Sequence, residues 1–331
     1  MALNWLVTGG CGFLGTALIK QLRSAEMAAS IRVLDSLAVG GRDDLAMVCS
    51  FREGHKGPED AAVELVVGDI RDPNTCVLCC RGMDVVVHFA ANTGVPVSID
   101  NPRLDMECNV AGTFNMLEAA RECGVSRFVF ASSGAPAGEV EPPIHEELPP
   151  HPVSPYGASK LAGEGYCSAY YRSFGVETVA LRFGNVYGPG SVHKNSVVAR
   201  FIRKALAGEP LEIYGDGSQT RDFIYIDDLI DAVILAATRQ GVGGEVFQIA
   251  TSRETTVNEI VEVIAKTLES MGIAQPEIVR TEPRLGDVKR NFSDTAKAKA
   301  MLGWECRWRL EDGMVETVRY FMEKIRRGCS S

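Results

Sequence analysis

Three regularly spaced glycines, among the four in the first fifteen residues, constrain the fold of this chain most. Residues 8–15 read TGGCGFLG, between a short apolar run at Trp5–Thr8 and a helical pattern at Phe13–Arg23. Tight turns, close approach of the backbone to a pyrophosphate, and close helix–strand packing each need a residue without Cβ. The free N–H groups of the following helix favour phosphate. A nucleotide-binding strand–turn–helix unit is therefore predicted on Gly9, Gly12 and Gly15.

Predicted strands and helices alternate through the first half of the chain, and residues 36–60 interrupt this alternation as an irregular segment. The predicted strands are Trp5–Thr8, Ile31–Asp35, Val63–Gly68, Val85–Ala90, Arg127–Ser132 and Thr178–Arg182. The predicted helices are Phe13–Arg23, Pro73–Cys80, Leu104–Cys123 and Pro155–Phe174. Near-continuous apolar strands that alternate with helices are typical of a parallel sheet covered on both faces. The sequence therefore predicts an α/β fold with a doubly wound parallel sheet (Rossmann).

Glycine and proline become more frequent after Asn185. Helices are predicted there at Ser196–Ala207, Val257–Ser270 and Leu310–Arg326. We expect residues 1–185 to form the nucleotide-binding domain, with a return of the chain around 224–250. Residues 186–331 are expected to form a smaller C-terminal α/β substrate lobe that completes a cleft beside the sheet.

Charge and apolar patterning exclude several classes of partner. The 331 residues include 34 Lys and Arg against 43 Asp and Glu, a net charge of −9. So acidic a chain is a poor binder of nucleic acid, which needs a basic face. The longest apolar stretches, such as Val85–Ala91, are far shorter than the roughly 20 residues that span a bilayer. We expect neither nucleic acid nor membrane as a partner.

The ten cysteines are scattered over helical and strand-like segments. In a chain of this length, that distribution indicates reduced thiols in a cytoplasm, and the N-terminus lacks the layout of a secretory signal. Cys76 and Cys79 form a CxxC without a second ligand pair. We interpret this pair as part of a helix face, and we expect a cytoplasmic protein without a metal site.

Two acidic residues follow predicted strands. Asp35 ends the second strand 20 residues after Gly15, where a carboxylate can accept hydrogen bonds from the adenosine ribose hydroxyls. It would repel a 2′-phosphate, so the sequence favours NAD over NADP. Asp69, followed by Ile70, stands where a carboxylate could hold the adenine amino group, or could simply cap a helix.

A tyrosine and a lysine are spaced for joint chemistry. Tyr156 and Lys160 lie at positions i and i+4, so one helix face presents both. A phenol with a pKa of about 10 is a poor base at pH 7, and lowering it by three units takes about 4 kcal/mol. A neighbouring ammonium and an oxidised nicotinamide could supply that. Without the nucleotide-binding segments, Tyr156 and Lys160 would be interpreted as two side chains on an exposed helix face.

Ser132 and Ser133 end a β-branched and aromatic strand some 23 residues before Tyr156. The carboxyl ends of parallel strands face the ligand crevice. A hydroxyl there can bridge a substrate oxygen and the phenol. Without Tyr156 and Lys160, the same serines would read as the start of a loop.

Together these segments resemble the extended short-chain dehydrogenase/reductase family, in particular its nucleotide-sugar epimerases and dehydratases. The resemblance covers nearly the whole chain. It is carried further by HFAA at 88–91, NVAGT at 109–113, LRFGNVYGP at 181–189, RDF at 221–223 and RLGDV at 284–288. It implies that Tyr156 is the acid/base, that Lys160 tunes it and holds the nicotinamide ribose, and that Ser133 hydrogen-bonds the reacting oxygen.

The resemblance also implies two sets of ligand contacts. The NAD contacts are Gly9, Gly12, Phe13, Leu14, Gly15, Asp35, Asp69, Ile70, Phe89, Ala90, Ala91, Asn109, Tyr156 and Lys160. For a UDP-sugar, Asn185, Arg221 and Arg284 would hold the diphosphate, Asp287 the uridine ribose and Tyr214 the uracil, with Ser132, Ser133, Tyr156 and Asn291 around the sugar. A homodimer through the helices at 104–123 and 155–174 is expected on the same ground.

The residues after Ser133 favour one reaction among these relatives. Related dehydratases place an Asp-Glu pair there and related decarboxylases a Glu, whereas this chain has Gly134 and Ala135. A single acid/base with NAD suffices for a 4-epimerase, which passes through a transient 4-keto sugar. We therefore predict an isomerase, an NAD-dependent UDP-hexose 4-epimerase.

The sugar stays open. Asn291 is of intermediate size where related epimerases gate the substituent at C2, so UDP-glucose, UDP-glucuronate and UDP-N-acetylglucosamine all remain candidates. The runs GSVHK at 190–194 and APAG at 135–138 depart from those of relatives. A dehydratase or decarboxylase, and an NAD-binding regulator without catalysis, are the alternatives.

Overall fold

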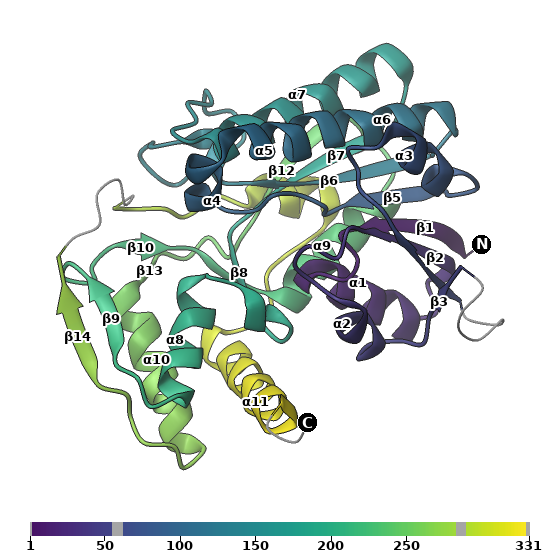
Figure 1. Ribbon diagram of the computed structural model, residues 1–331. Helices are drawn as coiled ribbons and strands as arrows, with labels where there is room; N and C mark the ends of the chain where they lie inside the picture. Colours follow the sequence, from purple (N-terminus) through teal and green to yellow (C-terminus); the bar gives the residue numbers. More distant parts are fainter. Residues whose placement is uncertain (1, 55–61, 283–288, 329–331) are drawn as a thin grey trace.

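The computed structural model describes residues 2–54, 62–282 and 289–328. Its centre is an eight-stranded, fully parallel sheet in the order β12-β7-β6-β5-β1-β2-β4-β3 (Figure 1). The strands are β1 Leu3–Thr8, β2 Ala28–Asp35, β3 Arg52–Glu53, β4 Val63–Val67, β5 Val85–His88, β6 Arg127–Ser133, β7 Thr178–Phe183 and β12 Glu245–Ile249. The predicted α/β fold with a doubly wound parallel sheet is confirmed.

Helices cover both faces of the sheet because alternate strand residues point to opposite sides. Val7, Val33 and Val87 belong to one buried cluster, with α1 (Phe13–Ser24) and α9 (Ile226–Thr238). Leu6, Leu34 and Val86 belong to the other, with α3 (Pro73–Cys80), α6 (Gly112–Glu122) and α7 (Pro155–Phe174). This alternation explains why the strands are apolar on both faces.

The helix expected over residues 104–123 is interrupted. The structure has α4 (Val95–Asp100), α5 (Pro102–Met106), a π-helical turn (Glu107–Ala111) and then α6. In that turn the Asn109 side chain bonds both the N–H and the C=O of Asn92. A side chain fixed to a neighbouring loop in this way accounts for the local widening of the helix.

The segment expected to be irregular also contains regular structure. Residues 42–46 form the short helix α2 (Arg42–Ala46), and β3 adds an edge strand beside β4. A short helix with little apolar periodicity gives only a weak sequence signal. Residues 55–61 lie outside the described part of the chain.

The C-terminal part is built from small units. Its helices are α8 (Val197–Leu206), α10 (Val257–Ser270) and α11 (Leu310–Gly328), with a 3₁₀ turn at Ser191–His193 and a π turn at Ala298–Leu302. Its strand pairs are β8 (Asn185–Tyr187) with β11 (Phe223–Tyr225), β9 (Leu211–Tyr214) with β14 (Ile278–Thr281), and β10 (Thr220–Arg221) with β13 (Thr255–Thr256). A further 3₁₀ turn, at Ala135–Ala137, follows β6. Between these units, α9 packs on α1 and β12 pairs with β7, so residues 226–249 join the large sheet.

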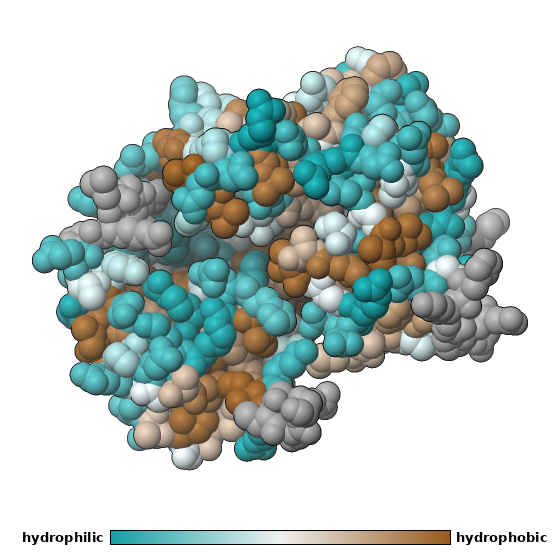
Figure 2. Space-filling view, viewed as in Figure 1, coloured by the Kyte–Doolittle hydropathy of each residue, from teal (hydrophilic) through white to brown (hydrophobic). Residues whose placement is uncertain are grey.

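No helix in the described residues combines the length and apolar character needed to cross a membrane. On the face shown in Figure 2, hydrophilic residues predominate, with apolar side chains among them over α4 and α5.

Candidate active site

The glycine-rich turn leads from β1 into α1. Gly9 has φ +68°, and a Cβ there would lie 2.9 Å from the backbone nitrogen of Ala90. At Gly15 a Cβ would lie 2.4 Å from the Cα of Gly10, so only glycine permits this packing. Gly12 caps α1 without a side-chain hydrogen bond, which leaves the first N–H groups of the helix available for an anion.

Asp35 ends β2 beside this turn and is buried. Its carboxylate accepts hydrogen bonds from the backbone N–H groups of Cys11, at 2.9 Å, and Leu37, at 2.8 Å. Burial raises the pKa of Asp35, while these two bonds oppose the rise. A carboxylate has about four acceptor positions, so two stay open for hydroxyl donors. The structure thus places Asp35 as expected for a residue that binds the ribose hydroxyls.

The next two strands end at the same edge of the sheet. Asp69 follows β4 and forms a 2.6 Å ion pair with Arg71, which lowers the pKa of Asp69. The Ile70 side chain is buried and faces Gly112, so its backbone is the part nearest solvent. After β5, Phe89 and Ala90 bond back to Thr8 of β1, and Ala91 follows half-buried.

The tyrosine and lysine occupy the first turns of α7. Ser154 caps this helix by accepting the N–H of Gly157 at 3.1 Å. The ammonium of Lys160 donates to the Ala131 carbonyl at 2.8 Å and lies 5.8 Å from the Tyr156 ring centroid. The predicted one-turn spacing therefore brings both side chains to the carboxyl end of β6.

Ser133 completes this cluster. Its hydroxyl hydrogen-bonds the Tyr156 phenol, which lowers the pKa of Tyr156, but burial raises it more, to about 12. Burial likewise lowers the pKa of Lys160 to about 8. Desolvation therefore outweighs the hydrogen bond from Ser133. The expectation that Lys160 and an oxidised nicotinamide together lower the pKa of the phenol stays a prediction.

The structure corrects the expected role of Ser132. Its hydroxyl points away from Ser133 and donates to the Glu164 carboxylate at 2.5 Å. Glu164 in turn holds Arg182 of β7 through two hydrogen bonds of 2.9 and 2.8 Å. All three residues are buried. Successive strand residues point to opposite faces, so only one of the two serines can face the crevice, and that one is Ser133.

The Asn109 side chain links α5, α7 and the loop after β5 at this site. Besides its bonds to Asn92, its amide donates to Asp105 at 2.9 Å and Ser159 at 3.2 Å. It is 1% exposed. These bonds give Asn109 a positioning role, and its expected NAD contact stays a prediction.

Asp105 was not singled out from the sequence. It is 1% exposed on α5, bonds Ser159 and Asn109, and its charge raises the pKa of Lys160. In the sequence, the one indication of its role is its position four residues before Asn109, which places both residues on the same helix face.

The candidate substrate residues of the second lobe form a second cluster. Asn185 is exposed at the start of β8, two residues after Phe183, the register partner of Ser133. The backbone of Asn185 bonds Asp222, next to the half-buried Arg221. The backbone N–H of Asn291 bonds Thr220, on the other side of Arg221, at 3.4 Å.

Tyr214 ends β9, with its ring 5.4 Å from the Arg200 guanidinium and its carbonyl bonded to Gln219. The structure thus brings Asn185, Arg221 and Asn291 to one strand junction, and Gln219 links the backbone of Tyr214 to the segment that precedes it. Arg284 and Asp287 lie outside the described residues.

Two further polar groups were missed. Two buried groups lack a hydrogen-bond partner: the hydroxyl of Ser196, at the N-cap of α8, and the amide nitrogen of Asn92, whose backbone bonds Asn109. Buried polar groups are normally satisfied, so both are candidates for ligand contacts. Of the two, the sequence indicates only Ser196, because it stands at the start of a predicted helix.

Comparison with known proteins identifies the family. The model of the "NAD dependent epimerase/dehydratase family" matches residues 5–250. This chain belongs to that family. A UDP-glucose 4-epimerase of Mycolicibacterium smegmatis is 36% identical over 327 residues, covering 97% of this chain and 99% of the relative. dTDP-glucose 4,6-dehydratases are also among its relatives.

Solved structures of epimerases have the same fold as this chain. The UDP-glucose 4-epimerase of Thermotoga maritima, crystallised with UDP-glucose, superposes with a TM-score of 0.87 at 33% identity, over 98% of this chain and 100% of the other. The enzyme of Thermus thermophilus, complexed with NAD, has a TM-score of 0.84 at 35% identity, over 97% and 99%. These comparisons confirm the predicted family, an NAD-dependent enzyme of the epimerase group, and NAD as its cofactor.

Proposed function

We propose that this protein interconverts the C4 epimers of a UDP-hexose, with UDP-glucose/UDP-galactose or UDP-glucuronate/UDP-galacturonate as the substrate pair. One observation carries the proposal. The Tyr156 phenol and the Ser133 hydroxyl are hydrogen-bonded beside the Lys160 ammonium, and the chain continues from Ser133 into Gly134 and Ala135, which carry no acid or base. The cluster thus offers a single proton-transfer group, which is what a redox step at C4 requires.

The residues around the turn fit NAD. The cap of α1 offers unbonded N–H groups to a pyrophosphate, Asp35 offers acceptors to ribose hydroxyls, and the unpartnered amide nitrogen of Asn92 offers a donor. When bound, NAD supplies a reversible hydride acceptor for C4. We assign Gly9, Gly12, Phe13, Leu14, Gly15, Asp35, Asp69, Ile70, Phe89, Ala90, Ala91, Tyr156 and Lys160 to the cofactor site.

The protein groups then handle the proton. Tyr156 takes the proton of the C4 hydroxyl as the 4-keto sugar forms and returns it when the hydroxyl is restored. Ser133 holds the reacting oxygen by a hydrogen bond. The Lys160 ammonium stabilises the phenolate, which burial alone disfavours. Epimerisation requires that the keto sugar turn over before hydride returns.

The second lobe is suited to the UDP part. Guanidinium groups bind diphosphate by charge-assisted, bidentate hydrogen bonds, so Arg221 can hold an anionic group within an acidic protein. Asn185 and Arg221 are adjacent across the strand junction, Tyr214 offers a ring for the uracil, and Asn291 stands beside Thr220 near the expected sugar. Arg284 and Asp287 are assigned to the diphosphate and ribose on family resemblance.

A substrate panel tests the proposal. The purified protein, without added NAD, is incubated separately with UDP-glucose, UDP-glucuronate and UDP-N-acetylglucosamine, and the products are resolved by NMR. We expect the C4 epimer of UDP-glucose or UDP-glucuronate. Absence of any C4 epimer, with NAD shown to be bound, would reject the assignment.

A second candidate is dehydration or decarboxylation, because dehydratases are among the relatives. The same assay separates these reactions, since they yield a 4-keto-6-deoxy sugar or a pentose. The Gly134-Ala135 sequence favours epimerisation, because expulsion of water from C5 and C6 needs a further acid and base.

We also propose a cytoplasmic homodimer that pairs through α6 and α7. The side chains of Phe114, Tyr166 and Phe174 are 39%, 39% and 56% exposed on these helices. Exposed apolar side chains that cluster in this way are typical of protein–protein interaction sites. All nine cysteines in the described part of the chain are free, in keeping with a reducing compartment.

A further inference from the structure

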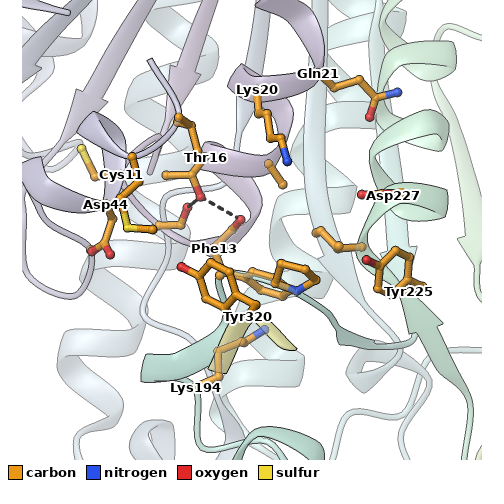
Figure 3. Close-up of a pocket in the computed structure, with 18 of the residues that line it drawn as sticks. Cys11, Phe13, Thr16, Lys20, Gln21, Asp44, Lys194, Tyr225, Asp227 and Tyr320 are labelled. Atoms are coloured by element: carbon orange, nitrogen blue, oxygen red, sulfur yellow. Dashed lines mark hydrogen bonds between the residues drawn. The ribbon is translucent and has the colours of Figure 1, made fainter. Parts of the chain in front are cut away.

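A cavity of about 760 Å³ lies along α1, and neither Tyr156 nor Lys160 lines it. It is bounded by α1, the start of α9, α11 and the loop at 189–194 (Figure 3). Of the residues assigned above to NAD or the sugar nucleotide, only Gly12 and Phe13 line it. Its size lies within the range of small-molecule sites, about 300–1,000 Å³. The cavity therefore shares Gly12 and Phe13 with the proposed cofactor site and is otherwise lined by different residues.

Aromatic rings form one wall of this cavity. Phe13, Tyr225, Trp308 and Tyr320 line it, and the Tyr225 and Trp308 rings lie 4.2 Å apart between centroids. Figure 3 shows Phe13, Tyr320 and Lys194 grouped together, with Lys20, Gln21 and Asp227 across from them. Rings from three separate parts of the chain thus converge on one space, as in sites that accept a planar apolar ligand.

Four carboxylates and two ammonium groups line the cavity, and Lys194 carries one of the two ammonium groups. Asp44 lies 3.4 Å from Lys324, and Asp231 accepts from Gln21 at 2.6 Å. Glu316 pairs with Arg319 at 2.5 Å. Burial raises the pKa of Asp227, the Lys20 ammonium opposes that rise, and the Asp231 and Glu316 carboxylates add to it. These contacts leave the four carboxylates with neighbours of their own.

Lys194 differs. Its ammonium stands 5.0 Å from the centroid of the Phe13 ring, and no carboxylate or hydrogen-bond acceptor contacts it among the residues that the structure describes. Burial lowers the pKa of Lys194 to about 8, so the amine is largely protonated at pH 7. This lysine closes the GSVHK run at 190–194, to which the proposed epimerase chemistry gives no task. A half-buried cation that has no counter-ion among the described residues favours an anionic ligand.

We propose that this cavity binds a small planar aromatic anion, with its ring on the Phe13–Tyr320 wall and its carboxylate or phosphate on Lys194. The ring recovers apolar contact area, and the anion supplies the missing counter-charge of the lysine. Gly190, where a Cβ would lie 3.2 Å from the Phe13 ring, keeps the loop close enough for Lys194 to reach that ring.

Fluorescence of 1-anilinonaphthalene-8-sulfonate tests the site in protein saturated with NAD and UDP, so that the sites described above are filled. We expect saturable binding that phenyl phosphate and benzoate displace, whereas benzyl alcohol and benzylamine do not. Lys194→Gln should weaken binding at least 10-fold, and Lys194→Arg should retain most of it.

Lys266→Gln is the matched control, because Lys266 is exposed and paired with Glu262 on α10, and it should leave binding unchanged. Thermal unfolding of each variant establishes that the fold is kept. Displacement by benzylamine in preference to benzoate, equal binding by Lys194→Gln and the parent protein, or a lack of saturable binding would each overturn the proposal. None of these outcomes bears on epimerase activity, which is measured separately.

Discussion

At the scale of single residues, burial works against the charged forms that the proposed chemistry needs. It raises the pKa of Tyr156 to about 12 and lowers the pKa of Lys160 to about 8. Ser133 opposes the first shift, and the Asp105 and Glu164 carboxylates oppose the second. The reactivity of the phenol therefore depends on charges placed around it rather than on the Tyr–Lys pair alone.

Removal of the phenol hydroxyl tests the assigned proton transfer. We expect Tyr156→Phe to reduce epimerisation by about 10³-fold, because positioned acid/base groups contribute roughly 10²–10⁴-fold. Turnover is measured by coupled assay or NMR, with NAD content checked by absorbance after denaturation. Near-parent turnover with bound NAD would contradict the role of Tyr156.

Replacement of Asp105 should change the pH dependence of kcat. Asp105→Asn removes the largest charge that raises the pKa of Lys160, so that pKa should fall below about 8. His88, Glu164 and Cys167 also face the ammonium and are unchanged. We expect the alkaline limb of the kcat profile to move to lower pH by about one unit.

Glu107→Gln is the matched control, since Glu107 lies two residues away and is half-exposed beside Arg103. Its alkaline limb should match that of the parent enzyme. An Asp105→Asn profile that differs from the parent only in height would show that Asp105 supports folding or packing but does not set the charge of Lys160.

At the scale of elements, one helix organises the catalytic end of the sheet. Residues 156, 160 and 164 recur every four positions on α7, so one face delivers Tyr156 and Lys160 to the crevice and Glu164 to the buried pair with Arg182. A Cβ at Gly163 would lie 2.4 Å from the Phe130 ring, which brings α7 close against β6. The ion pair fixes the register of the helix on the sheet.

Breaking that pair should cost stability. Glu164→Leu leaves the Arg182 guanidinium and the Ser132 hydroxyl buried without their acceptor. We expect the free energy of unfolding to fall by about 3–5 kcal/mol, measured in urea. The double variant Glu164→Leu/Arg182→Met removes the orphaned charge as well and should recover much of the loss. Equal losses in the single and double variants would contradict this explanation.

At the scale of the whole molecule, apolar surface gathers on one side. Ile99 and Met106 of α4 and α5 are 60% and 45% exposed, and the Phe114 and Tyr166 rings meet at 5.5 Å between centroids. Figure 2 shows apolar side chains over α4 and α5. Exposed aromatic clusters on adjacent helices are typical of protein interfaces, in agreement with the proposed homodimer.

A charge placed in this patch should separate the subunits. We expect the parent protein to sediment as a dimer and Phe114→Glu/Tyr166→Glu as a monomer, because two carboxylates per subunit would be buried unpaired. Ile278→Glu is the control, since Ile278 is 48% exposed on β14 of the smaller lobe. A parent monomer, or a double variant that stays dimeric, would exclude this interface. Circular dichroism verifies the fold of each variant.

The sequence by itself determined the parallel sheet, the glycine turn and the helix that carries Tyr156 and Lys160. These features follow from local rules: apolar runs of strand length, glycines where a Cβ collides, and side chains four residues apart on one helix. Each is decided within about twenty residues of chain.

Only the tertiary structure decided which polar groups face the crevice. Neighbouring serines look alike in sequence, but pairing of β6 with β7 turns Ser132 onto Glu164 and leaves Ser133 for Tyr156. Asp105 and Lys194 acquire their character from burial beside residues distant in the chain. Desolvation and counter-charges depend on three-dimensional neighbours, which no local pattern encodes.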